Sequence, residues 1–105
     1  MIANTPKPPY YVVIFSTLLT DVTEGYLETA TRMEELAKLQ PGYLGIESAR
    51  EVLGITVSYW ESLEAIKQWK NNVEHTVARK KGKALWYKQY QLRICKVEHD
   101  YGFEK

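Results

Sequence analysis

Residues 43–60, YLGIESAREVLGITVSYW, decide how the rest of the chain is interpreted. Two runs within this stretch, residues 43–50 and 53–60, have the side-chain alternation that is typical of β-strands. The connection that opens at Glu51 is so short that the two strands should pair as an antiparallel hairpin. In the second run one face is formed by Leu53, Ile55, Val57 and Tyr59, and the other by Gly54, Thr56, Ser58 and Trp60.

A strand and a helix are predicted before this hairpin. Residues 10–19, YYVVIFSTLL, are β-branched and aromatic and are apolar on both alternating faces, which is typical of a strand covered on both sides. Residues 24–40 then follow a helical period, and Pro41-Gly42 ends that helix. The apolar side of the helix consists of Tyr26, Ala30, Met33, Leu36 and Ala37.

A helix and a strand are predicted after the hairpin. Ser62 caps the helix and Gly82 is expected to end it, but we keep open a break at Asn71-Asn72, since Asn is favoured at both ends of helices. Residues 87–99 form the last strand, with a bulge expected near Cys95 and Val97. The apolar stripe of the helix is Leu63, Ile66, Trp69, Val73 and Val77, and one face of the strand carries Tyr90, Leu92 and Ile94.

The order of these elements is β-α-β-β-α-β, which is the ferredoxin-like arrangement of the α+β class. The prediction is a single domain over residues 10–105, with a four-stranded antiparallel sheet and two helices on one face. Residues 1–9 contain three prolines and are expected to be a flexible lead-in. The other face of the sheet would carry Tyr, Trp, Phe and Ile side chains that nothing else in the chain can cover. We therefore predict a homodimer that packs sheet against sheet.

The composition excludes several classes of protein. With 14 basic and 13 acidic residues the net charge is +1, so no strong field is available to hold nucleic acid or an anionic membrane. The single cysteine, Cys95, excludes a disulfide framework and a multi-cysteine metal site, and its place on a strand predicts a buried apolar side chain. No run reaches the ~18 apolar residues of a membrane span. We expect a cytoplasmic protein without metal, nucleic-acid or membrane partners.

Residues 54–101, GITVSYWESLEAIKQWKNNVEHTVARKKGKALWYKQYQLRICKVEHDY, resemble the antibiotic biosynthesis monooxygenase family. The resemblance extends over nearly the whole chain from Tyr10 and implies a dimeric α+β barrel, in agreement with the uncovered sheet face. The family includes cofactor-independent monooxygenases of polycyclic aromatic substrates, haem-degrading and quinol monooxygenases, and members of unknown role. The matching features are Tyr59-Trp60, Trp69, His75, Gly82, Trp86-Tyr87, Val97-Glu98, the first helix and the turn at residues 40–43.

The resemblance makes Trp69 and His75 the candidate catalytic residues. In the resembling oxygenases a Trp at this helix position contacts substrate or haem; the alternative for Trp69 is plain core packing. His75 has the chemistry of a base or of a haem ligand. In an unbroken helix, however, it lies about 600° beyond Trp69, toward solvent. Only a break at Asn71-Asn72 would turn it inward.

Five further residues are predicted to bind substrate: Phe15, Trp60, Arg79, Trp86 and Tyr90. For Trp86 the alternative is a dimer contact or a plug under a loop. Arg79 opens a basic run that ends at Lys83, and such a run is typical of a solvated helix end, where cations complement the helix dipole. The alternative for this run is that it attracts an anionic ligand.

The family patterns are incomplete in this chain. The haem-degrading branch has an Asn on the first strand, where this chain has Phe15, Ser16 and Thr17. That branch also has a longer spacing from the Trp to the His, and at this spacing the chain has Arg79. Some members have an Asn one turn before the Trp, where this chain has Ala65. The resemblance implies a small monooxygenase that acts with O2 on an aromatic or quinol-like substrate without a tightly bound cofactor. Haem remains open as a ligand, and a non-catalytic ligand-binding, stress-related module is the alternative.

Overall fold

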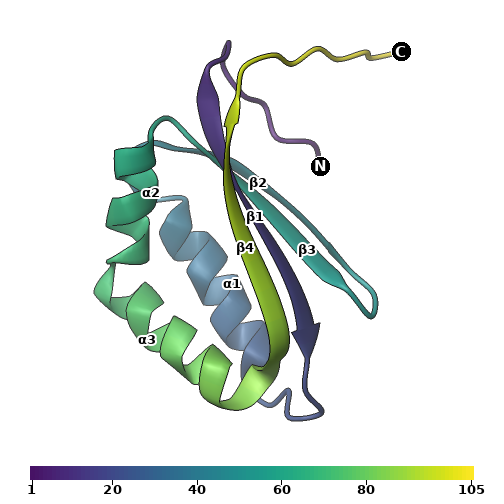
Figure 1. Cartoon of the computed structure of the whole chain (residues 1–105), viewed down its shortest axis with the longest axis vertical. Coiled ribbons are helices and arrows are strands. Elements are labelled where there is room, and N and C mark those ends of the chain that lie inside the picture. The colour runs from purple at the N-terminus through teal and green to yellow at the C-terminus, as the bar shows by residue number, and fades with distance from the viewer.

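The computed structural model describes residues 1–105 and consists of one four-stranded sheet with all helices on one side (Figure 1). The ferredoxin-like α+β prediction is confirmed, although the first helix is shorter than residues 24–40 and the second is divided. None of the helices has the length and hydropathy of a membrane span. The elements are β1 (Tyr10–Leu19), α1 (Tyr26–Ala37), β2 (Tyr43–Arg50), β3 (Gly54–Trp60), α2 (Leu63–Lys70), α3 (Val73–Lys81), a π-helical turn (Gly82–Trp86) and β4 (Tyr87–Val97).

The strands lie in the order β2-β3-β1-β4, and every neighbouring pair is antiparallel. β1 therefore lies in the middle of the sheet, and β4 is an edge strand. The register places Tyr11 opposite Trp60, and Phe15 opposite Leu92 of β4. Because Trp60 packs in one cluster with Ala65 of α2, the face that these side chains share is the helix side of the sheet.

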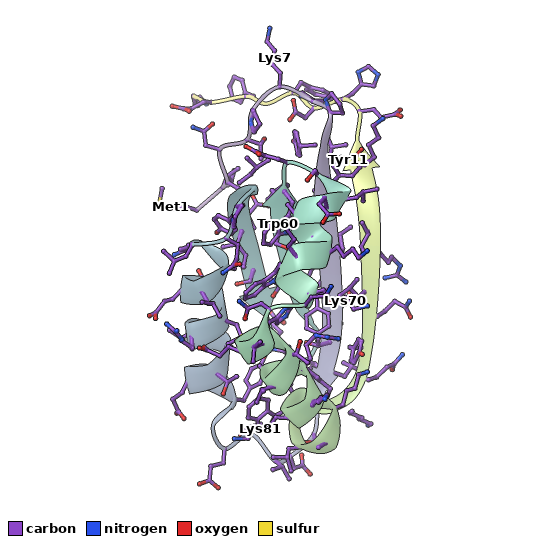
Figure 2. The ribbon with its side chains drawn as sticks, turned by 90° about the vertical axis from the view of Figure 1, so that its left-hand side faces the viewer. Met1, Lys7, Tyr11, Trp60, Lys70 and Lys81 are labelled. Atoms are coloured by element: carbon purple, nitrogen blue, oxygen red, sulfur yellow. The ribbon has the colours of Figure 1, made fainter.

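The buried core is small, and its largest cluster lies at the Trp60 end of the helix–sheet layer. Only 10 of 105 residues are buried, and the largest cluster joins Trp60 to Ala37, Ala65 and Ile66. Further along the same face, Leu92 and Ile94 of β4 remain 44% and 49% exposed. Figure 2 shows the molecule from the helix side, with α2 and α3 in front and β4 lying beside them. The layer is therefore open to solvent along β4.

The second helical segment breaks at Asn71-Asn72. α2 ends at Lys70, and the Asn72 side chain caps α3 by accepting the backbone N–H of His75 at 3.0 Å. The apolar stripe predicted for a continuous helix is consequently wrong beyond the break, because the new helix starts with a different phase. Val73 and Val77, both placed on that stripe, are 81% and 61% exposed.

The last part of the chain departs from the prediction at four points. Gly82 does not end the helix, because a π-helical turn follows in which the backbone N–H of Tyr87 bonds to the Gly82 carbonyl. The irregularity in pairing lies where β4 leaves this turn, opposite Leu18 and Leu19, and not near residues 95–97. β4 ends at Val97 rather than near residue 99, and Cys95 is exposed because it lies on an edge strand.

The outer face of the sheet differs from the prediction in its aromatic residues. Phe15 and Trp60 point to the helices, so the outer face is formed by Tyr10, Val12, Ile14, Ile55, Val57 and Tyr59. Both chain ends lie on this side (Figure 1). The backbone N–H of Ala3 donates to Glu47 at 2.8 Å, and the Tyr10 hydroxyl donates to Asp100. At the opposite end Ile55 is 40% exposed, so the chain covers only part of this face.

Candidate active site

Two aromatic rings from successive helices lie in contact at the helix–sheet layer. The imidazole of His75 stacks on the indole of Trp69, with ring centroids 4.1 Å apart and planes inclined by 10°. The other side of Trp69 is stacked with Trp60 of β3, at 6.3 Å and 23°. The structure therefore brings the two predicted catalytic residues together, and we call them the Trp69–His75 pair.

The helix break is what places His75 in this pair. An unbroken helix would carry the residue about 600° past Trp69, to the solvent side. The turn at Asn71-Asn72 instead folds α3 back, so that Nδ1 of His75 lies 2.9 Å from the backbone oxygen of Trp69. Of the two orientations that the sequence left open, the structure has the inward one.

The hydrogen bond to Trp69 assigns the tautomer of His75. A carbonyl oxygen can only accept, so Nδ1 of the neutral imidazole carries the proton and donates it. Nε2 is then an unprotonated acceptor, and it makes no hydrogen bond within the chain. Because the only buried and unpartnered side-chain nitrogen or oxygen is Nε of Arg79, Nε2 of His75 is accessible to solvent or ligand.

The indole N–H of Trp69 is free in the same way. Trp60 donates its Nε1 hydrogen to Ser58 at 2.9 Å, and Trp86 donates its own to the Glu24 carbonyl at 3.0 Å. Nε1 of Trp69 has no such partner and is not buried. The Trp69–His75 pair therefore presents one free donor and one free acceptor on two stacked rings.

The surroundings of His75 favour its neutral form. Burial lowers the pKa of His75 below its ordinary value of 6.5, and the nearby charge of Arg79 lowers it further. The hydrogen bond to the Trp69 backbone acts in the opposite direction but does not outweigh burial. At neutral pH the side chain is thus an uncharged imidazole, which is the form that accepts a proton.

Arg79 lies one helical turn beyond His75, on the same side of α3. Its Nη2 donates to the Lys70 carbonyl at 3.3 Å, while its Nε is buried and has no partner. The two salt bridges of the chain join other residues, namely Arg32 with Glu74 and Lys38 with Glu34. A partly buried cation without a carboxylate therefore stands beside the imidazole.

A second aromatic cluster occupies the same face of the sheet at Phe15, about 13 Å along β1 from Tyr11, the residue that pairs with Trp60. Phe15 lies 5.5 Å from Tyr87 and 5.4 Å from Tyr90 between ring centroids, so two of the predicted substrate-binding residues are in contact. Burial raises the pKa of Tyr87 to about 12, so its hydroxyl stays protonated at neutral pH. Tyr90 is 37% exposed and is the accessible member of this cluster.

Sequence reasoning missed a polar group at this second cluster. Arg50, at the end of β2, donates to the hydroxyl of Thr17 and, at 3.5 Å, to that of Tyr26. Its guanidinium also lies 5.8 Å from the centre of the Tyr26 ring. The sequence places Arg50 on the same strand face as Ile46 and Ser48, because the three residues alternate in phase. Only the strand register shows that this face of the sheet meets the helices.

Trp60 and Trp86, both predicted to bind substrate, are 0% and 2% exposed. Trp60 supports Trp69 from the sheet side. Trp86 lies edge-on to Tyr26 at 5.7 Å and bonds to the backbone of Glu24, so it fills the space beneath the start of α1. This buried position agrees with one of the alternatives given for Trp86, namely that its side chain packs beneath a loop.

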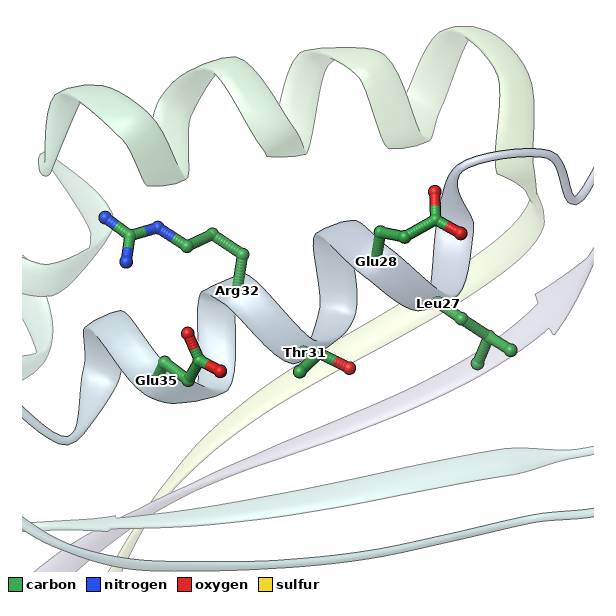
Figure 3. Close-up of a pocket in the computed structure, with 5 residues that line it drawn as sticks. All are labelled: Leu27, Glu28, Thr31, Arg32 and Glu35. Atoms are coloured by element: carbon green, nitrogen blue, oxygen red, sulfur yellow. The ribbon is translucent and has the colours of Figure 1, made fainter.

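Two hollows along the helices include neither residue of the Trp69–His75 pair. One lies along α1 and is lined by Leu27, Glu28, Thr31, Arg32 and Glu35 (Figure 3). It contains no aromatic or imidazole side chain, and its arginine is already paired with Glu74. No group of three or more His, Cys, Asp and Glu side chains is placed to hold a metal ion.

Comparison with known proteins agrees with this architecture. Residues 9–81 match the family model described as antibiotic biosynthesis monooxygenase. The chain therefore belongs to the antibiotic biosynthesis monooxygenase family. It is also 48% identical over 106 residues to the uncharacterized protein YqjZ of Bacillus subtilis strain 168, with 99% of this chain and 93% of that protein covered.

Solved structures share the fold at low sequence identity. SnoaB of Streptomyces nogalater, described as a cofactor-independent oxygenase, superposes with a TM-score of 0.75 at 10% identity, over 89% of this chain and 97% of its own. A putative antibiotic biosynthesis monooxygenase from Nitrosomonas europaea gives a TM-score of 0.73 at 13% identity, over 94% and 99%. These similarities establish the fold of the whole domain.

The Asn72 cap can be tested against its neighbour. Asn72→Ala removes the acceptor for the His75 N–H and is expected to lower the free energy of unfolding by about 1 kcal/mol. Asn71→Ala is the matched control, since the Asn71 side chain makes no hydrogen bond, and its effect should stay within about 0.5 kcal/mol. Urea unfolding measures both. Equal losses in the two variants would contradict the assigned cap.

Proposed function

We propose that this protein is a small monooxygenase that oxidises an aromatic or quinol-like molecule with O2 at the Trp69–His75 pair. The observation that carries the proposal is the free acceptor at Nε2 of a neutral His75, whose ring is stacked on the indole of Trp69 with its own free donor at Nε1. A phenol or quinol needs both groups. Its hydroxyl donates to Nε2, and the oxygen that gains negative charge accepts from the indole N–H.

Removal of a proton prepares such a substrate for O2. His75 takes the proton, and the resulting anion is electron-rich both at oxygen and at ring carbon. Reaction of that carbon with O2 and loss of water converts a ring CH2 of the keto tautomer into a carbonyl, with the balance CH2 + O2 → C=O + H2O. All four electrons come from the substrate, so the reaction needs no external reductant.

The open aromatic layer supplies the binding surface in this proposal. Tyr90 and Leu92, exposed on the helix side of β4, offer apolar contact to a planar ring, and Phe15 lies behind them. A bound ring would displace water from the same layer and strengthen the hydrogen bonds to the Trp69–His75 pair. The fold relative SnoaB is described as a cofactor-independent oxygenase, and we propose that this chain likewise needs no tightly bound cofactor.

Haem fits the residues less well. Nε2 of His75 has the right chemistry for an axial ligand. The positions of β1 that face the site hold Phe15 and Thr17, where the haem-degrading branch has an Asn. At the longer Trp-to-His spacing of that branch, this chain has Arg79 in place of the His. The haem-degrading set is thus not reproduced, and we assign no step to haem. A non-catalytic binding module would use the same donor and acceptor but would consume no O2.

We further propose that two copies pack through the outer faces of their sheets. Ile14, Ile55 and Val57 lie on this face, and Ile55, at the end away from the two termini, is 40% exposed. Burial of such a face is the usual way in which a small open sheet gains a second layer. The helix-side site stays accessible in this arrangement, because it lies on the opposite side of the sheet.

Oxygen uptake tests the monooxygenase directly, with anthrone and a panel of quinols as substrates. His75→Gln is expected to lower kcat/KM by roughly 100- to 10,000-fold, the range of a lost general base. In the wild type, kcat/KM should rise with pH through the lowered pKa of His75 and level off near neutrality, since only neutral His75 accepts the proton.

His99→Gln is the matched control for this experiment, because His99 is exposed in the C-terminal tail and makes no contact with the site. It should leave uptake unchanged. If His75→Gln retained full activity, the role of the base would be wrong. If the wild type consumed no O2 above the spontaneous rate with any substrate, the binding module would be the better description.

The dimer is tested by light scattering during gel filtration. The wild type should elute with twice the 12.2 kDa mass of the chain. Val57→Lys places a charge in the centre of the outer face and should shift the protein toward the monomer. Val73→Lys, at an exposed position on α3, should not. A monomeric wild type, or two variants with equal masses, would contradict the proposed interface.

A further inference from the structure

The surroundings of Arg79 support an inference about the class of substrate, which rests on the proposed function. The guanidinium has five N–H donors and uses one of them, in a bond of 3.3 Å to the Lys70 carbonyl. Its Nε is the only buried side-chain nitrogen or oxygen of the chain without a partner. Nη1 makes no hydrogen bond within the chain and is not buried, so it is the donor that a ligand can reach.

No acidic side chain compensates this charge. Arg79 takes part in neither salt bridge of the chain, and Glu74, the acid nearest to it along α3, is bound to Arg32 by two hydrogen bonds. The strands that face the helices add no carboxylate on that side, since Glu47 lies on the outer face with Tyr59. The helix–sheet layer thus contains a cation without a counterion.

The position of this cation relates it to the Trp69–His75 pair. Arg79 follows His75 by four residues, so both side chains leave α3 on one side. The positive charge of Arg79 contributes to the lowered pKa of the His75 imidazole. α3 runs from α2 toward the π-helical turn that leads into β4 (Figure 1). The Arg79 guanidinium points back along α3 to the Lys70 carbonyl, so it lies at the junction of α2 and α3, close to the His75 imidazole.

We infer that Arg79 is a specificity-determining residue that binds an anionic group, and that the substrate is an aromatic hydroxy acid rather than a neutral phenol. The hydroxyl of the substrate donates a hydrogen bond to Nε2 of His75, and a carboxylate on the same or a neighbouring ring forms an ion pair with the Arg79 guanidinium. A charge-assisted hydrogen bond from the accessible Nη1 supplies the missing counterion.

Two matched probes test the inference by calorimetric titration: 3-hydroxy-2-naphthoate, which carries the carboxylate, and 2-naphthol, which lacks it. The wild type should bind the hydroxynaphthoate roughly 10- to 100-fold more tightly, as expected for one charge-assisted bond. Arg79→Gln should remove this preference and leave the affinity for 2-naphthol unchanged. Arg79→Lys should retain part of it, because the charge remains.

Lys80→Gln is the control, since it makes the same change of charge at the adjacent exposed position. It should keep the preference of the wild type. The wild type could bind both probes with equal affinity, and Trp69→Ala could abolish this binding. That result would overturn the role of Arg79 while leaving the aromatic site in place. Equal weakening of both probes by Arg79→Gln would indicate a structural role and would also overturn the inference. If neither probe bound, this inference and the proposed site would fail together.

Discussion

The candidate site depends on the hydrogen bond between the Asn72 side chain and the backbone N–H of His75. This cap ends one helical phase and starts another, and the new phase turns His75 onto Trp69 instead of into solvent. The carbonyl of Trp69 then fixes the tautomer of the imidazole, and burial keeps it neutral. The Asn72 cap thus brings His75 onto Trp69, and the Trp69 carbonyl determines which ring nitrogen stays free.

The open helix–sheet layer follows from the size of the chain. Only 10 of 105 residues are buried; they include Trp60 at one end of the layer and Trp86 at the other, while Leu92 and Ile94 of β4 stay exposed. The Trp69–His75 pair and the aromatic cluster of Phe15, Tyr87 and Tyr90 both lie on this helix-facing side of the sheet.

Much of the fold was predictable because local patterns dictate it. The bounds of β1 and β2 match the β-branched and aromatic runs, and the Asn71-Asn72 break follows from capping preference. The faces of the strands were harder, because β1 is apolar on both sides and only its register with β3 turns Phe15 toward the helices. The candidate pair Trp69 and His75 came from family resemblance. Their contact, and the group around Arg50, depend on long-range packing that periodicity does not encode.

The protonation state of His75 is the central claim, and nitrogen-15 NMR of the imidazole measures it most directly. The account predicts a neutral ring at pH 7 with the proton on Nδ1, a bare Nε2, and a midpoint below 6.5 when the pH is lowered. His99 provides an internal reference in the same spectrum. A proton on Nε2 at neutral pH, or a midpoint above 6.5, would contradict the assignment of His75 as the base.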